Sequence, residues 1–130
     1  MKKIFKRIAA MSAAVMMMAS ISSMGVSAVT ITYSVGGYSL QCGASKTTDN
    51  GLFISSAVTD QSVTVNVSGK AKYYYNNKYI TTGNGNSGKA AITAVISKKG
   101  GSWISLDTQH MVNSKIKYIS SSIWKALEVF

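Results

Sequence analysis

The sequence is poor in the residues that carry most enzyme and metal chemistry. It has one cysteine, Cys42, one histidine, His110, four carboxylates and no proline. A single cysteine excludes an internal disulfide, and one cysteine with one histidine is too few for a structural zinc site. Four carboxylates, two of them beside expected turns, give poor support to a glycosidase that needs a carboxylate pair. We therefore expect no metal, no cofactor and no catalytic site.

Cys42 and His110 are the one pair that could form a thiol nucleophile and its base. The sequence around Cys42 offers neither a cation nor a helix start to stabilise a thiolate, so we interpret Cys42 as a small buried apolar residue. His110 follows Asp107 by three residues, a spacing that puts the two side chains on opposite faces of a strand. We predict that His110 is a hydrogen-bonded core residue. A hydrolase using Cys42 and His110 stays open as an alternative.

The N-terminal segment has the order of charge and hydropathy that is typical of a signal peptide. Four cations lie among the first seven residues, an uncharged and mostly apolar segment spans 8–24, and residues 26–28 are the small or short apolar residues that a signal peptidase reads. We predict that 1–28 is cleaved after Ala28, so that 29–130 is a secreted, extracellular bacterial domain. An uncleaved membrane anchor is the alternative, but no cationic stop-transfer cluster follows.

The predicted mature chain is cationic, and all of its cations are lysines. Ten lysines face four carboxylates, a net charge of +6, and the only arginine, Arg7, lies in the leader. Net charge bears on partners and solubility rather than on fold. Sequence-specific nucleic-acid recognition usually employs the planar arginine fork, so we do not expect it. We expect anionic cell-envelope polymers or a membrane surface as partners.

Alternation of apolar and polar residues dominates the predicted mature domain. It indicates about seven short strands, rich in β-branched residues and separated by Gly, Asn and Ser turns. This pattern predicts a single all-β domain, an antiparallel β-sandwich or barrel. The segments with strand character are 29–35, 38–42, 52–59, 63–67, 71–82, 90–96, 103–112 and 115–119.

Glycine and asparagine mark the expected turns. Gly36 and Gly37 predict a hairpin, and 76–77 predicts a turn or a bulge. We interpret 83–88 as a flexible loop and 98–101 as a second hairpin turn. Residues 103–112 are expected to present one buried face, made of Ile104, Leu106, His110 and Val112.

One segment imitates a phosphate-binding motif. Residues 83–89 fit the pattern G-x-x-x-x-G-K, but the next residue is Ala90, which has no hydroxyl to hold magnesium. The segment that follows has strand character, whereas the phosphate-binding loop begins a helix. We therefore interpret the match as a turn rich in Gly and Asn.

The C-terminal segment fits two patterns. A helical face with Ser120 or Ser121 as its cap predicts a short helix, whereas alternation over 123–129 predicts a final strand. We favour the strand slightly. In that case 123–130 would offer an edge to a second copy, which raises the alternative of a structural or self-assembling surface protein.

The segment 70–79 is the most informative for function, because lysines and tyrosines are interleaved there. An exposed tyrosine offers rigid apolar area with a hydrogen-bonding tip, and a neighbouring lysine attracts anions. We predict a cationic, non-enzymatic binding site for cell-surface material. Its residues are Lys70, Lys72, Tyr74, Lys78 and Tyr79.

In layout the chain resembles the small Sec-exported bacteriocins of the lactococcin type. The shared features are a signal peptide, a compact cationic β domain rich in Gly, Ser, Asn and Tyr, and an aromatic last residue, Phe130. The resemblance implies a toxin acting on related bacteria as an alternative function. It supplies no motif and therefore no functional residue.

Overall fold

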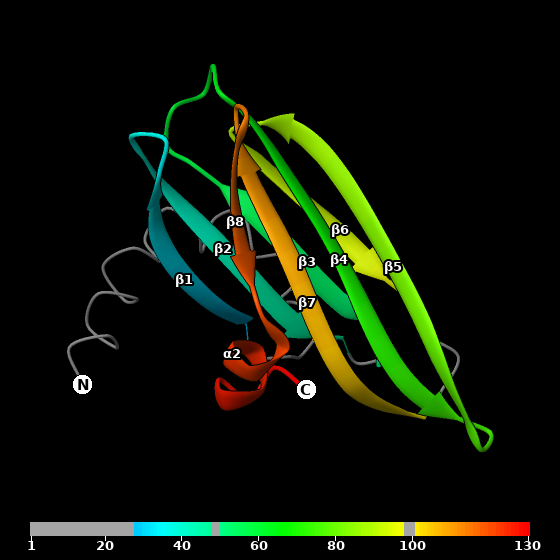
Figure 1. The fold of residues 1–130 in the computed structure, drawn as a ribbon. Coiled ribbons are helices and arrows are strands. Elements are labelled where there is room, and N and C mark those ends of the chain that lie inside the picture. Colours follow the sequence, from blue (N-terminus) through cyan, green and yellow to red (C-terminus); the bar gives the residue numbers. More distant parts are fainter. Residues whose placement is uncertain (1–27, 48–49, 98–100) are drawn as a thin grey trace.

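The computed structural model describes residues 28–47, 50–97 and 101–130. Within these residues two antiparallel sheets of four strands pack face to face (Figure 1), which confirms the predicted all-β class and, of the two predicted architectures, the sandwich. The predicted leader, apart from Ala28, lies outside the described residues. The elements are β1 (Ala28–Val35), β2 (Tyr38–Lys46), β3 (Leu52–Ala57), β4 (Thr64–Tyr75), β5 (Lys78–Lys89), β6 (Ala91–Ile96), β7 (Ser102–Val112), β8 (Lys115–Ile119) and α2 (Ser121–Ala126).

Each sheet has two pairings between consecutive strands and one between strands distant in the sequence, β3 with β6 and β4 with β7. The first sheet has the order β1-β2-β3-β6 and the second, called sheet B from here on, has the order β5-β4-β7-β8. Because β6 and β7 belong to different sheets, 98–101 connects the sheets and the predicted hairpin turn there is wrong. Residues 98–100 themselves lie outside the described residues.

Two hairpins confirm the turn predictions. Gly36 and Gly37 have φ values of 59° and 84° and join β1 to β2, and Asn76 and Asn77 have φ values of 55° and 62° and join β4 to β5. A two-residue hairpin loop with φ positive at both positions matches the right-handed twist of the strands, and glycine and asparagine tolerate that conformation. The predicted aromatic strand 71–82 is therefore divided between β4 and β5, and its first part is continuous with the predicted strand 63–67, so that the described residues form eight strands.

The interpretation of 83–88 as a flexible loop is wrong, because these residues belong to β5. This strand pairs with β4 along its whole length, from Lys78 opposite Tyr75 to Lys89 opposite Thr64. Glycine is needed at Gly83 because a Cβ there would lie 2.5 Å from a backbone oxygen of β4. The residues that match the phosphate-binding pattern thus lie in an edge strand of sheet B, and they do not form a phosphate-binding loop.

Side chains join β5 to β6, the two strands that end the sheets on one side. The Asn84 side chain donates from Nδ2 to the Val95 carbonyl at 2.7 Å, and its Oδ1 accepts from the Gly85 N–H at 2.9 Å. Asn86 repeats this pattern: its Nδ2 donates to the Thr93 carbonyl, and its Oδ1 accepts from the Ser87 N–H. Each amide therefore stands where a peptide group of a neighbouring strand would lie. We call these two contacts the amide bridges.

The C-terminal segment forms the helix α2, so the slightly favoured strand is wrong and the possible short helix is confirmed. Trp124 is fully buried and donates from Nε1 to Thr108 Oγ1 at 2.9 Å. Ser121 Oγ accepts from the Leu106 N–H at 3.1 Å, and the Ser121 N–H donates to Asp107. Burial of one tryptophan and these bonds fix the helix against β7. The edge expected at 123–130 for pairing with a second copy is therefore not a strand.

A β-bulge changes the expected inner face of β7. The pairing with β4 shifts between Lys72, opposite Ser105, and Tyr73, opposite Trp103, which leaves Ile104 as the extra residue. Ile104 is 42% exposed, so its predicted place in the core is wrong. The other residues predicted for this face are buried as expected. They are Leu106, His110 and Val112.

Candidate functional site

Four of the five predicted binding residues lie on one face of the sandwich, the outer face of sheet B. Lys70, Lys72 and Tyr74 alternate along β4, and Tyr79 lies directly opposite Tyr74 on β5. The two tyrosine rings have centroids 4.9 Å apart at an angle of 57°, and they are 37% and 68% exposed. Tyr74 Oη also donates to Asn77 Oδ1 at 3.2 Å, which fixes the pair at the hairpin tip.

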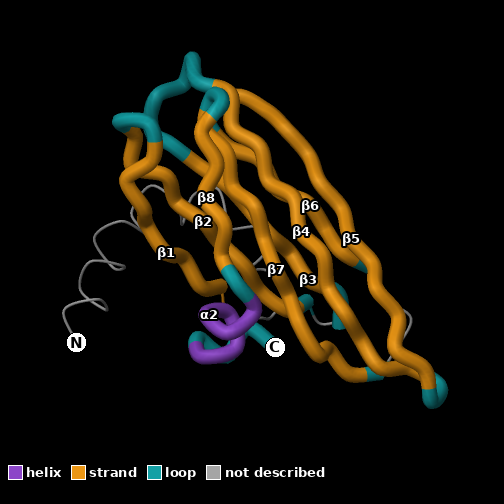
Figure 2. Tube along the Cα trace, in the orientation of Figure 1, coloured by secondary structure: helices purple, strands orange, loops and turns teal. Residues whose placement is uncertain are grey.

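The fifth residue, Lys78, lies on the opposite side of the same hairpin. It pairs with Tyr75, one position along from the pair formed by Tyr74 and Tyr79, and successive strand residues point to opposite faces. Figure 2 shows the tip of the β4–β5 hairpin projecting past the ends of the other strands. Lys78 is therefore exposed, but the structure does not bring it together with the other four.

The two lysines of this face have different surroundings. Lys70 lies opposite Asp107 of β7, whose Oδ1 accepts from a backbone N–H at 3.0 Å. Lys72 lies between Thr81 of β5 and Ser105 of β7, both uncharged. The positive charge of Lys72 is therefore the less compensated of the two, and it lies closer to the tyrosine pair.

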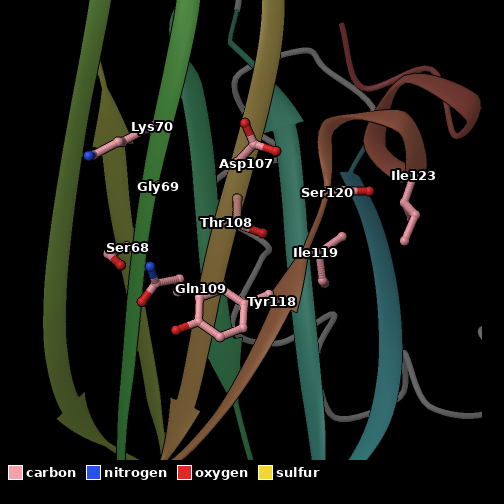
Figure 3. A pocket seen from close by; sticks show the side chains of 10 residues that line it. All are labelled: Ser68, Gly69, Lys70, Asp107, Thr108, Gln109, Tyr118, Ile119, Ser120 and Ile123. Atoms are coloured by element: carbon pink, nitrogen blue, oxygen red, sulfur yellow. The ribbon is translucent and has the colours of Figure 1, made fainter.

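A groove of about 440 Å³ crosses the same face beside Lys70. Its central row is formed by Ser68, Gln109 and Tyr118, which lie in register across β4, β7 and β8. Figure 3 shows these side chains beside one another, with Ile123 of α2 at the far side. Tyr118 is 64% exposed. Its ring is thus open to solvent next to an amide and a hydroxyl.

The sequence analysis singled out only the segment 70–79, so it missed Ser68, Gln109 and Tyr118, although Tyr118 also follows a lysine. Alternation in 103–112 puts Gln109 outward once His110 is inward, and 115–119 puts Tyr118 outward in the same way. What brings Gln109 opposite Tyr118 is the β7–β8 hairpin register. The adjacency of β4 and β7, which adds Ser68 and Lys70, comes from long-range pairing that periodicity does not show.

His110 is fully buried at the centre of a hydrogen-bonded network between the sheets. Ser56 Oγ donates to the Asn66 carbonyl at 2.8 Å and lies 2.9 Å from His110 Nδ1. Thr108 Oγ1 accepts from Trp124 Nε1 and lies 2.7 Å from His110 Nε2. Every donor and acceptor of this network is paired when the imidazole is neutral, with its proton on Nδ1 donated to Ser56 and with Thr108 donating to Nε2. Burial lowers the pKa of His110 to about 4, and the Ser55 carbonyl opposes this.

Cys42 is also fully buried, as predicted, and lies opposite Ser56 in the β2–β3 pairing. Its Sγ donates weakly to the Leu40 carbonyl at 3.9 Å. Burial raises the pKa of the Cys42 thiol, an effect that the charge of Lys117 opposes only in part. A buried thiol of raised pKa is a poor nucleophile, and both nitrogens of His110 already have hydroxyl partners. This geometry supports a structural role for both residues.

The remaining observations concern metals, membranes and relatives. Among the described residues, no group of three His, Cys, Asp or Glu side chains gathers to hold a metal ion. In those same residues, no helix has the length and apolar character needed to span a bilayer. Comparison with protein families, curated proteins and solved structures finds no match.

Proposed function

We propose that the protein is a secreted, non-enzymatic domain that binds anionic polymers of the cell envelope through the outer face of sheet B. The observation that supports this most is the gathering of Lys70, Lys72, Tyr74 and Tyr79 on that face. Lysines attract polyanions over a range set by the ionic strength, and the exposed rings add contact area at low cost in side-chain entropy.

The charge balance of the chain supports a polyanion as the partner. Outside the predicted leader, ten lysines face four carboxylates. On the proposed binding face, Asp107 is a carboxylate whose Oδ1 accepts from the Ser121 N–H. Lys89 adds a further cation to β5, where its Nζ donates to the Ser62 carbonyl at 3.3 Å. The face therefore has an excess of positive charge over a length of several residues.

The test is binding of the secreted protein to purified bacterial cell walls at increasing salt. We expect binding that weakens steeply as salt rises, because exposed charges are screened. The double variant Lys70→Gln with Lys72→Gln should weaken binding about tenfold, since two charge contacts are lost. The matched control, Lys46→Gln with Lys125→Gln, removes the same charge from exposed sites elsewhere and should have a much smaller effect.

Two results would contradict the proposal. One is the absence of wall binding at low salt, and the other is an equal loss in the two double variants, which would show that net charge alone matters. Spotting the secreted protein on lawns of related bacteria tests the bacteriocin alternative. Growth inhibition that survives Lys70→Gln with Lys72→Gln would favour that alternative.

A further inference from the structure

The groove beside Tyr118 has the side chains that a sugar ring requires. An exposed aromatic ring offers a flat apolar surface, while Gln109 and Ser68 offer an amide and a hydroxyl that donate and accept. Asp107 is oriented by the Ser121 N–H on Oδ1, so its Oδ2 can accept from a ligand hydroxyl. Small-ligand sites usually combine an aromatic wall with a small number of precisely placed polar groups.

The charges of the groove favour an uncharged ring over an anionic head group. The groove is lined by one cation, Lys70, and one carboxylate, Asp107, so its charges balance, and Ser68, Gln109 and Tyr118 add hydroxyl and amide groups. A phosphate or carboxylate placed in this row would meet the Asp107 carboxylate, whereas sugar hydroxyls would donate to it. The less compensated cation, Lys72, lies four residues from Ser68 along β4, about 13 Å away.

The groove and the tyrosine pair are two ends of one continuous surface. The residues between them on β4 alternate outward, from Tyr74 through Lys72 and Lys70 to Ser68. From Tyr74 to Ser68 the strand rises about 20 Å. A polymer lying along this line would meet aromatic rings at both ends and cations in the middle.

We infer that the groove formed by Ser68, Gln109, Asp107 and Tyr118 is a subsite for an uncharged sugar unit. The polymer bound by this face is then an acidic glycan, in which acidic units meet Lys72 and a neutral unit meets Tyr118. This inference rests on the proposed function and narrows it, because polyanions without sugars would lack the groove contact.

The test compares two soluble carboxylate polymers, hyaluronan and polyglutamate, by titration calorimetry with the secreted protein. Hyaluronan alternates acidic and neutral sugars, whereas polyglutamate carries the same anionic group without sugars. We expect Tyr118→Ala to weaken hyaluronan binding about tenfold and to leave polyglutamate binding unchanged. Gln109→Ala should act in the same direction. The control Tyr75→Ala removes an exposed tyrosine from the opposite side of the hairpin and should change neither.

The outcomes separate this inference from the proposed function. If Tyr118→Ala leaves hyaluronan binding unchanged while Lys70→Gln with Lys72→Gln weakens both polymers, the subsite is wrong and the polyanion function stands. If neither polymer nor cell walls bind, both fail. If phosphatidylglycerol vesicles bind in a Tyr118-dependent way and hyaluronan does not, the face is a lipid surface and the inference is overturned.

Discussion

At the scale of single residues, His110 shows how a titratable group is held neutral in a protein core. Its two nitrogens contact the hydroxyls of Ser56 and Thr108, and Thr108 in turn accepts from Trp124. A protonated ring would need acceptors at both nitrogens, but Thr108 donates to Nε2 in this network. Protonation of Nε2 therefore forces Thr108 to give up its donor role to the ring, and it places a charge in the core.

This arrangement predicts that acid destabilises the fold well above the usual pKa of carboxylates. The pKa of His110 is lowered by burial to about 4, from 6.5 in the unfolded chain, so between these values the unfolded state binds a proton that the folded state does not. We expect the free energy of unfolding to fall by about 2 kcal/mol between pH 7 and pH 5. Urea denaturation at both pH values measures this.

The control is His110→Gln, which keeps an amide donor and acceptor at this position and removes the titration. We expect this variant to be less stable at pH 7, because the amide cannot reproduce the ring's geometry, but to lose most of the dependence on pH between 7 and 5. A variant with the same pH dependence as the native protein would show that another group is responsible.

Several features of single residues were predictable because they depend on local geometry. The burial of Cys42 and the separation of Asp107 from His110 follow from the alternation of strand residues. The pairing of Tyr74 with Tyr79 follows from a two-residue turn at 76–77. The exposure of Ile104 did not follow, because a bulge is set by the partner strand.

At the scale of elements, the amide bridges explain why a segment with the composition of a loop forms a strand. Asn84 and Asn86 are poor strand formers, yet each donates one hydrogen bond to a carbonyl of β6 and accepts one from the next backbone N–H of β5. The gain comes from contacts with a strand of the other sheet, which no local pattern in 83–88 reveals. The helix α2 is a similar case, since burial of Trp124 selects helix over strand.

We expect Asn84→Ala and Asn86→Ala each to lower the free energy of unfolding by about 1–2 kcal/mol, because each loses two hydrogen bonds and exposes strand-edge carbonyls. Urea denaturation at neutral pH measures the loss. The matched control is Ser87→Ala, an exposed position on the other face of β5, for which a change within about 0.5 kcal/mol is expected.

The variant that combines Asn84→Ala with Asn86→Ala can also be tested by its oligomeric size. Freed carbonyls on β6 would offer a pairing edge to another copy, so we expect size-exclusion chromatography to show higher oligomers for Asn84→Ala with Asn86→Ala than for the native protein. Alanine variants that match the native protein in stability and in size would show that the bridges contribute nothing.

At the scale of the whole molecule, the predicted cleavage site lies at the edge of the described fold. Strand β1 begins at Ala28, and removal of 1–28 would keep its pairs from Val29 opposite Ala44 to Val35 opposite Tyr38. The all-β class and the restriction to a sandwich or a barrel were predictable, because short alternating segments have few other ways to bury one face each. The strand order β5-β4-β7-β8 was not, because it depends on long-range pairing.

We expect the intact mass of the secreted protein to correspond to a chain that begins at Val29. Signal peptidase requires small residues at the cleavage site, so Ala28→Tyr should leave the leader attached and reduce secretion several-fold, while the conservative control Ala28→Ser should behave as the native protein. A secreted protein whose mass includes Met1 would refute the predicted processing.

The amide bridges have a consequence for the way this architecture can change over time. In a true barrel the seam is made of backbone, so opening it requires many simultaneous alterations. Here two asparagine side chains supply hydrogen bonds that bridge β5 and β6. Substitutions at Asn84 and Asn86 could strengthen or weaken the contact between the two sheets one hydrogen bond at a time. Evolution or a protein engineer could therefore adjust this contact in small, independent steps.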